Sequence, residues 1–121
     1  MNDNTFPLCE LKRRIQQFTE ERDWGQFHDL KNLSMALSIE AGELMEHFRW
    51  VSNTDANALM SDAQVAEAIR EEAADVLLLL TQFANVAGID LMEAAEKKLL
   101  LNEARYPVEK CKGVSTKYDK L

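Results

Sequence analysis

The chain has little of what strands, tight turns and covalent cross-links require. Only two prolines and four glycines occur in 121 residues, and no stretch of alternating β-branched residues reaches five positions. The two cysteines, Cys9 and Cys111, match neither a zinc-ligand spacing nor a CxxC redox motif. Residues that favour helices, such as alanine, leucine and glutamate, are frequent instead. These features exclude a β-rich fold and a disulfide or zinc scaffold, and they predict an all-α protein with reduced thiols.

Positive charge and long apolar runs are also scarce. The formal net charge is −7 at pH 7, so the chain lacks the basic surface that a nucleic-acid polymer requires. The longest apolar run covers only residues 76–80, whereas a bilayer-spanning helix needs about 20 apolar residues. The first residues contain no basic region and no apolar run, so we expect no signal peptide. We therefore expect a cytoplasmic protein that binds neither a nucleic-acid polymer nor a membrane.

Apolar periodicity predicts four helices in a single domain that covers residues 1–121. We expect these helices at residues 8–24, 30–48, 62–87 and 91–106, and flexible tails at residues 1–7 and 108–121. Ser61 or Asp62 is expected to cap the third helix, Gly88 to end it, and Asp90 to cap the fourth. Residues 76–80 are apolar on every side of the third helix, which indicates a helix that is buried all round. A domain this small can rarely enclose a helix completely. We therefore expect a four-helix bundle-like domain completed by homo-oligomerisation, as a homodimer or homotetramer.

Two acidic pairs lie in the middle of consecutive long helices. Glu40 and Glu43 form the first pair, and each member shares a helix face with the other because they are three residues apart. Glu72 and Asp75 form the second pair in the same way. With residues placed about 100° apart around the axis, the first pair flanks an apolar stripe, Glu72 falls within another, and Glu46 points outward. Four carboxylates in contact repel one another unless a cation compensates them, so the pairs predict a Mg²⁺ site.

Two alternatives to a metal-dependent enzyme can be weighed on the sequence. The chain has 21 Asp and Glu residues, so acidic pairs arise easily by chance, and a non-enzymatic helical dimerisation or adaptor module with surface acidic pairs stays open. Glu72 argues against it, because a carboxylate in an apolar stripe is costly to bury without compensation. A di-iron bundle would need Glu-x-x-His pairs. Neither His28 nor His47 stands three residues after a pairing glutamate, so this class is weak.

Further motifs accompany the acidic pairs along nearly the whole chain. Arg-Asp-Trp stands at 22–24, Phe-His at 27–28, Phe-Arg-Trp at 48–50, Glu-Glu-Ala-Ala-Asp-Val at 71–76 and Arg-Tyr-Pro at 105–107. In this order the motifs resemble the MazG-like superfamily of all-α nucleoside triphosphate pyrophosphohydrolases, in particular its dCTP pyrophosphatase-like branch. The resemblance implies hydrolysis of a (deoxy)nucleoside triphosphate, dCTP-like in its base, to the monophosphate and pyrophosphate, as in house-cleaning of the nucleotide pool.

The same resemblance implies roles for individual residues. Both acidic pairs would bind Mg²⁺, and Glu40 or Glu43 would take a proton from the attacking water, with the choice between them open. Aromatic rings stack on bases, so Trp24 and Trp50 are candidates for a base pocket, although both could instead plug the core. The expected substrate-binding residues are Trp24, His28, Asn32 and Trp50 around the base and sugar, and Lys98, Asn102, Arg105 and Tyr106 around the phosphates.

Overall fold

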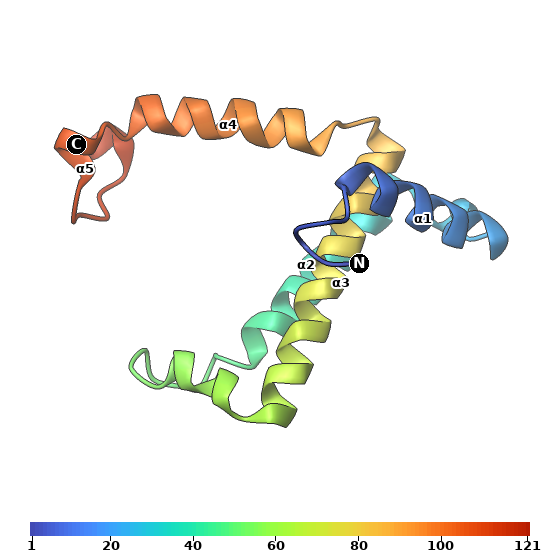
Figure 1. The fold of residues 1–121 in the computed structure, drawn as a ribbon, viewed down its shortest axis with the longest axis horizontal. Helices are drawn as coiled ribbons and strands as arrows, with labels where there is room; N and C mark the ends of the chain where they lie inside the picture. The colour runs from blue at the N-terminus through green and yellow to red at the C-terminus, as the bar shows by residue number, and fades with distance from the viewer. The chain divides into compact units, whose positions relative to one another are not determined.

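The computed structural model describes every residue from Met1 to Leu121, and all of its regular elements are helical (Figure 1). Its long helices are α1 (Leu8–Glu21), α2 (Leu30–Glu46), α3 (Ala63–Ala87) and α4 (Leu91–Arg105), which confirms the all-α prediction. The shorter elements are the 3₁₀ helices η1 (Gly25–Phe27), η2 (Ala56–Ser61) and η3 (Tyr118–Lys120) and the short helix α5 (Val108–Cys111). The chain divides into two compact units, Met1–Gly88 and Ile89–Leu121. The single domain over residues 1–121 stays a prediction.

Helix α3 is the central element of the first unit. It packs against both α2 and α1 (Figure 1). The buried apolar side chains come from all three helices, with Ile15 on α1, Leu33 on α2, and Ala66, Ile69 and Ala84 on α3. Helix α3 contributes most of this small core, and its packing against α2 brings the helices that carry the two acidic pairs side by side.

The predicted apolar stripes only partly match the buried face. Helical periodicity places Leu30 on the apolar stripe of α2 and Leu80 on that of α3, but their side chains are 41% and 37% exposed. Thr81, which the stripe omitted, is fully buried. Its hydroxyl donates a hydrogen bond of 2.7 Å to the Leu77 carbonyl oxygen of the same helix, so burial leaves no polar atom of this side chain unpaired. Hydrophobicity alone could not identify a core position that a threonine occupies.

Polar contacts join α1 to α3 beside this core. The Asn85 side-chain amide donates to the Lys12 carbonyl oxygen at 3.1 Å. One turn earlier on α3, the Gln82 amide donates to the Thr19 hydroxyl at 3.5 Å. Thr19 is itself buried, so its hydroxyl depends on this partner. These contacts fix α1 on α3 through groups that a hydrophobic pattern does not reveal.

Helix α1 ends earlier than the sequence predicted. The prediction extended it to Trp24, but the last helical residue is Glu21. Asp23 adopts a left-handed backbone conformation with φ 51°, which aspartate tolerates better than most residues and which no α-helix can continue. The Trp24 amide then donates to the Thr19 carbonyl oxygen at 3.0 Å. Trp24 therefore leaves the helix and turns toward the connection with α2.

Asp62 begins α3, the helix that carries the second acidic pair. Its side chain accepts hydrogen bonds from the backbone amides of Gln64 and Val65, at 3.0 and 3.2 Å. Replacing Asp62 by alanine should therefore lower the free energy of unfolding by about 1 kcal/mol. Urea denaturation measures this change, and Asp62→Asn, which retains a capping oxygen, is the matched control. Equal losses in both variants would contradict the capping role.

The second unit consists of α4 and the segment that follows it. Asp90 caps α4 by accepting a hydrogen bond of 3.0 Å from the Glu93 amide, as the sequence predicted. The Glu93 carboxylate pairs with Lys97 at 2.7 Å. After α4, Pro107 precedes α5, and η3 forms close to the C-terminus. Residues 108–121 thus carry two short helical elements, and their flexibility stays a prediction.

Two expectations from composition concern location. No single helix is both long enough and apolar enough to cross a membrane, and only α3 and α4 taken together reach that length and composition. Cys9 and Cys111 are free thiols. The cytoplasmic location stays a prediction.

Candidate metal centre

Helices α2 and α3 bring three of the predicted carboxylates together. Glu40 and Glu43 lie one turn apart on α2, and Glu72 lies on α3. One carboxylate oxygen of each lies within 4.8 Å of the others. Asp75, one turn beyond Glu72, is exposed, and its negative charge acts on both Glu40 and Glu72. Both members of the first pair and Glu72 of the second therefore form one cluster, whereas Asp75 does not belong to the group of oxygens within 4.8 Å.

Two oxygens of this cluster lack any hydrogen-bond partner. They are Oε2 of Glu40 and Oε2 of Glu72, and both are buried. A buried carboxylate oxygen without a donor is costly, because it has lost its water and gained nothing in return. A hard divalent cation prefers oxygen ligands of this kind and would supply the missing partner. The residues present therefore fit Mg²⁺.

The crowding of negative charge changes the acidity of two members of the cluster. The pKa of Glu40 is raised from 4.5 to about 7, first because its carboxyl shares a hydrogen bond with Glu43 and then because it is desolvated and faces three other carboxylates. The pKa of Glu72 is raised chiefly by desolvation, and then by the hydrogen bond and charge of Glu43 and by the charge of Asp75. The charge of His47 acts in the opposite direction on Glu72. Both shifts favour the protonated form of these carboxyl groups when no cation is bound.

The stability of the protein without bound metal should fall as the pH rises. Glu40 ionises near pH 4.5 in the unfolded chain and near pH 7 in the folded one, so the folded state holds a proton between these values that the unfolded state has lost. The free energy of unfolding should therefore decrease from pH 4.5 to pH 7. Above pH 7 the contribution of Glu40 should stay at its lowest value, because the carboxyl group is then ionised in both states. Melting curves in chelator across this range measure the effect. Glu40→Gln should flatten the profile, whereas the outward-facing Glu71→Gln should not, and parallel profiles for all three proteins would contradict the prediction.

A cavity of about 270 Å³ opens beside the cluster and is lined by Glu43, Glu46, His47 and Glu72. The His47 Nε2 atom lies 4.0 Å from Oε1 of Glu72. Glu46 was expected to point toward solvent, and its side chain is exposed. Its Oε2 atom lies 3.6 Å from a guanidinium nitrogen of Arg49, and the same side chain also lines the cavity. It is the last residue of α2, where the chain turns away from the ideal helix. The three-residue spacing from Glu43 was the available indication of this position.

The predicted tryptophans lie in different surroundings. Trp50 is 80% exposed, so it does not plug the core, and the guanidinium of Arg49 lies 4.5 Å from its ring centroid. Trp24 is 43% exposed. Its ring meets Phe18 edge-on at a centroid distance of 5.6 Å and His28 at 6.5 Å. Both indole rings therefore keep accessible surface, which a stacking role requires.

His28 and Asn32 lie at the connection between α1 and α2. The Asn32 side-chain amide donates to the Phe27 carbonyl oxygen at 3.2 Å, and its backbone amide donates to the Asp29 side chain at 2.9 Å. His28 lines a cavity of about 60 Å³ together with Thr19 and Gln82, among others. This volume suits water rather than a nucleobase. Asn32 thus has a clear structural contact, and the substrate roles of both residues stay predictions.

The predicted phosphate-contacting residues all lie in the second unit. Lys98 and Asn102 lie about one turn apart on α4. Arg105 is the last residue of this helix, and Tyr106 is its C-cap. Lys98 is exposed, and Asn102 and Arg105 are half-buried. The Arg105 guanidinium lies 4.6 Å from the ring centroid of Tyr118, a residue of the predicted C-terminal tail. The assignment of these four residues to the phosphates stays a prediction.

Comparisons with known proteins agree with this arrangement. Residues 35–121 match the sequence profile of the MazG-like family. The chain is 39% identical over 114 residues to dCTP pyrophosphatase 1 of Mus musculus, a match that covers 94% of this chain and 67% of the mouse protein. It is 36% identical over 114 residues to dCTP pyrophosphatase 1 of Homo sapiens, with the same coverage. A crystal structure of a pyrophosphatase from Archaeoglobus fulgidus superposes with a TM-score of 0.78 and 32% identity, over 88% of this chain and 98% of that one. The chain belongs to the MazG-like family.

Proposed function

We propose that this chain hydrolyses a nucleoside triphosphate, dCTP-like in its base, to the monophosphate and pyrophosphate at a Mg²⁺ site on α2 and α3. The observation that carries the proposal is the cluster of Glu40, Glu43 and Glu72, with oxygens within 4.8 Å of one another and two of them buried without a partner. The related proteins named dCTP pyrophosphatase 1 and the pyrophosphatase of A. fulgidus support the same reaction.

The residues of the cluster divide the chemical work between them. Glu40, Glu43, Glu72 and Asp75 would hold Mg²⁺, which when bound stabilises the negative charge that develops on phosphate oxygens as the bond between the α and β phosphates breaks. Glu40 or Glu43 accepts the proton of the attacking water. His47, whose Nε2 atom lies 4.0 Å from Oε1 of Glu72, can form an ion pair with that carboxylate when it is protonated.

The substrate contacts are those that the family resemblance implies, and side-chain chemistry is compatible with each of them. Trp24 and Trp50 offer accessible indole faces for stacking on a base. Lys98 and Arg105 supply the positive charge that a triphosphate needs in a chain of net charge −7. Asn102 on α4 and Tyr106 at its C-cap can donate hydrogen bonds to the phosphates, while His28 and Asn32 complete the base and sugar contacts.

A screen of triphosphates with Mg²⁺ tests the proposed function directly. The products distinguish cleavage after the α-phosphate, which gives the monophosphate and pyrophosphate, from cleavage after the β-phosphate, which gives the diphosphate and phosphate. We expect the monophosphate and pyrophosphate, with dCTP among the best substrates and with activity lost in chelator. Absence of turnover with every triphosphate would favour the non-enzymatic helical module instead.

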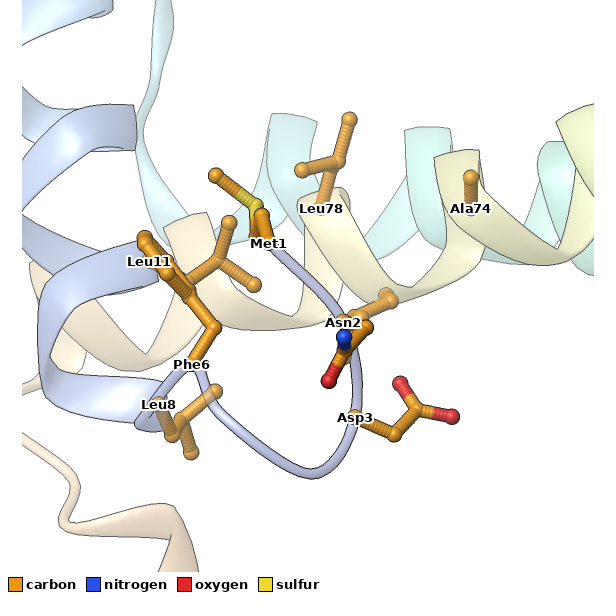
Figure 2. A pocket seen from close by; sticks show the side chains of 9 residues that line it. Met1, Asn2, Asp3, Phe6, Leu8, Leu11, Ala74 and Leu78 are labelled. Carbon is orange, nitrogen blue, oxygen red and sulfur yellow. The ribbon is translucent and has the colours of Figure 1, made fainter.

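We also propose that the chain functions as a homodimer or homotetramer. Leu77, Leu78 and Leu80 on α3 are 47%, 39% and 37% exposed in the isolated chain. Figure 2 shows Leu78 beside Met1, Phe6 and Leu11 around a cavity of about 410 Å³ between the N-terminal segment, α1 and α3. Apolar surface that is contiguous across three segments favours a protein partner, and a second copy meets the same need on both sides.

The protein should behave as a dimer or tetramer at micromolar concentration in light scattering. Leu78→Glu should lower the measured mass toward that of the monomer, because a carboxylate on the apolar face would be desolvated in the interface. The helix content of the variant, measured by circular dichroism, shows whether the chain itself remains folded. A monomer mass for the parent protein would contradict the assembly and leave the exposed leucines unexplained.

A further inference from the structure

Tyr118 closes a small aromatic and cationic cluster at the end of α4. The guanidinium of Arg105 lies 4.6 Å from the Tyr118 ring centroid, and the Tyr106 ring meets Tyr118 edge-on at 6.0 Å with an interplanar angle of 86°. The Lys117 ammonium lies 5.8 Å from the same ring. Tyr118 therefore contacts two residues that the proposed function assigns to the phosphates, although it lies outside both the acidic cluster and the four long helices.

The backbone of the second unit brings Tyr118 back to α4. The chain leaves α4 at Tyr106, forms α5, and reverses at Gly113, whose φ of +81° is strained for any residue with a side chain. It then enters η3, which begins at Tyr118. The Lys120 amide donates to the Lys117 carbonyl oxygen at 2.9 Å and holds this turn together. The contact with Arg105 thus depends on a defined path of the chain.

Arg105 has no competing acidic partner within the second unit. No carboxylate of Ile89–Leu121 lies within salt-bridge distance of its guanidinium, whereas Lys97 and Lys117 are both paired with acids. A guanidinium that stacks its face on an aromatic ring still presents its N–H groups at the edge. Those N–H groups match the oxygens of a phosphate in a bidentate contact. The ring therefore restrains the cation without consuming the donors that a phosphate would use.

We propose that Tyr118 is a positioning residue that holds the Arg105 guanidinium ready to contact the phosphates of the substrate. This inference rests on the proposed function. The aromatic face of Tyr118 is the required feature, and its hydroxyl is not. Without the ring, Arg105 would sample many rotamers and would pay the cost of ordering at each binding event.

Steady-state kinetics with dCTP and Mg²⁺ test the proposal. Tyr118→Leu should raise KM about three- to thirtyfold, the range that corresponds to one cation–π contact, and should change kcat much less. Tyr118→Phe retains the ring and should keep KM within about twofold of the parent. Lys120→Gln, which removes an exposed cation of the same turn that makes no contact with the ring, is the matched control and should behave like the parent. An unchanged KM in Tyr118→Leu, or an equal loss in Tyr118→Phe, would overturn the proposal.

A double-mutant cycle separates positioning from a general structural role. In an Arg105→Ala background, Tyr118→Leu should have no further effect on KM, because the group that it positions is gone. Gly113→Ala should raise KM in the same direction as Tyr118→Leu, because it strains the turn that returns Tyr118 to α4. A Tyr118→Leu effect that persists without Arg105 would contradict the inference while leaving the proposed function intact. If the parent protein neither binds nor hydrolyses any triphosphate, the proposed function fails, and this inference fails with it.

Discussion

Replacing Glu72 by glutamine should reduce triphosphate hydrolysis about a thousandfold or more while the protein stays folded. The substitution preserves the shape of the side chain but removes one negative ligand from the cluster of Glu40, Glu43 and Glu72. Loss of several kcal/mol of metal-dependent transition-state stabilisation corresponds to a factor of this size. Asp75→Asn should act in the same direction. Pyrophosphate release from dCTP under saturating Mg²⁺ measures both variants.

The adjacent Glu71 provides a matched control for this prediction. It is exposed on the same helix and outside the cluster, so Glu71→Gln should keep near-parental activity. Removal of a charge from a repelling cluster should also leave the melting temperature of Glu72→Gln in chelator equal to or above that of the parent. Near-normal turnover of Glu72→Gln and Asp75→Asn would refute the assignment. A lower melting temperature with lost activity would instead indicate a structural role.

The spacing of residues predicted the helices well where a cap or a breaker marks their ends. Ser61 or Asp62 was expected to cap α3, and the structure has Asp62 in that role; Asp90 was expected to cap α4. Both aspartate side chains accept the hydrogen bonds that capping requires. Gly88 was expected to end α3, and its left-handed φ of 69° does so. The end of α1 was missed because an aspartate, not a glycine, adopts the left-handed conformation at position 23. A capping side chain at a helix end can be recognised in the sequence. A left-handed backbone conformation at a residue other than glycine, as at Asp23, cannot.

The acidic cluster was predictable for the same reason. Each acidic pair can be recognised in the sequence from its three-residue spacing on one helix face. Only the packing of α2 on α3 is needed in addition to bring the carboxylates of the two helices together. The contacts of Trp50 and Tyr118 required more than spacing. Trp50 follows the end of α2 and was equally compatible with the core, and Tyr118 returns to Arg105 through a turn that no periodicity describes. Irregular segments place side chains through individual backbone angles, and those come only from the structure.

Replacing Trp50 by alanine should raise KM for dCTP about five- to a hundredfold, the range expected from loss of roughly 1–3 kcal/mol of base stacking. The side chain is 80% exposed and contacts the Arg49 guanidinium, so its surface is available to a ligand. The effect on kcat should be smaller, because the proposed function assigns the metal and the attacking water to the acidic cluster and not to Trp50. Discrimination between dCTP and purine triphosphates should decrease in the variant, because the stacking surface is a property of the base site.

The melting temperature of Trp50→Ala is the control for this prediction, because it distinguishes loss of binding from loss of folding. Loss of a core tryptophan costs about 3–5 kcal/mol, whereas an exposed one should change the melting temperature little. Trp50→Ala should therefore melt close to the parent, and Trp50→Phe, which retains an aromatic face, should recover most of the affinity for dCTP. If Trp50→Ala binds dCTP as well as the parent does, Trp50 is not part of the base pocket, and the preference for a pyrimidine must come from Trp24 and its neighbours. If the variant loses activity only by unfolding, the exposed position of Trp50 is covered in the assembled protein, and the ring belongs to the interface between copies rather than to the substrate site.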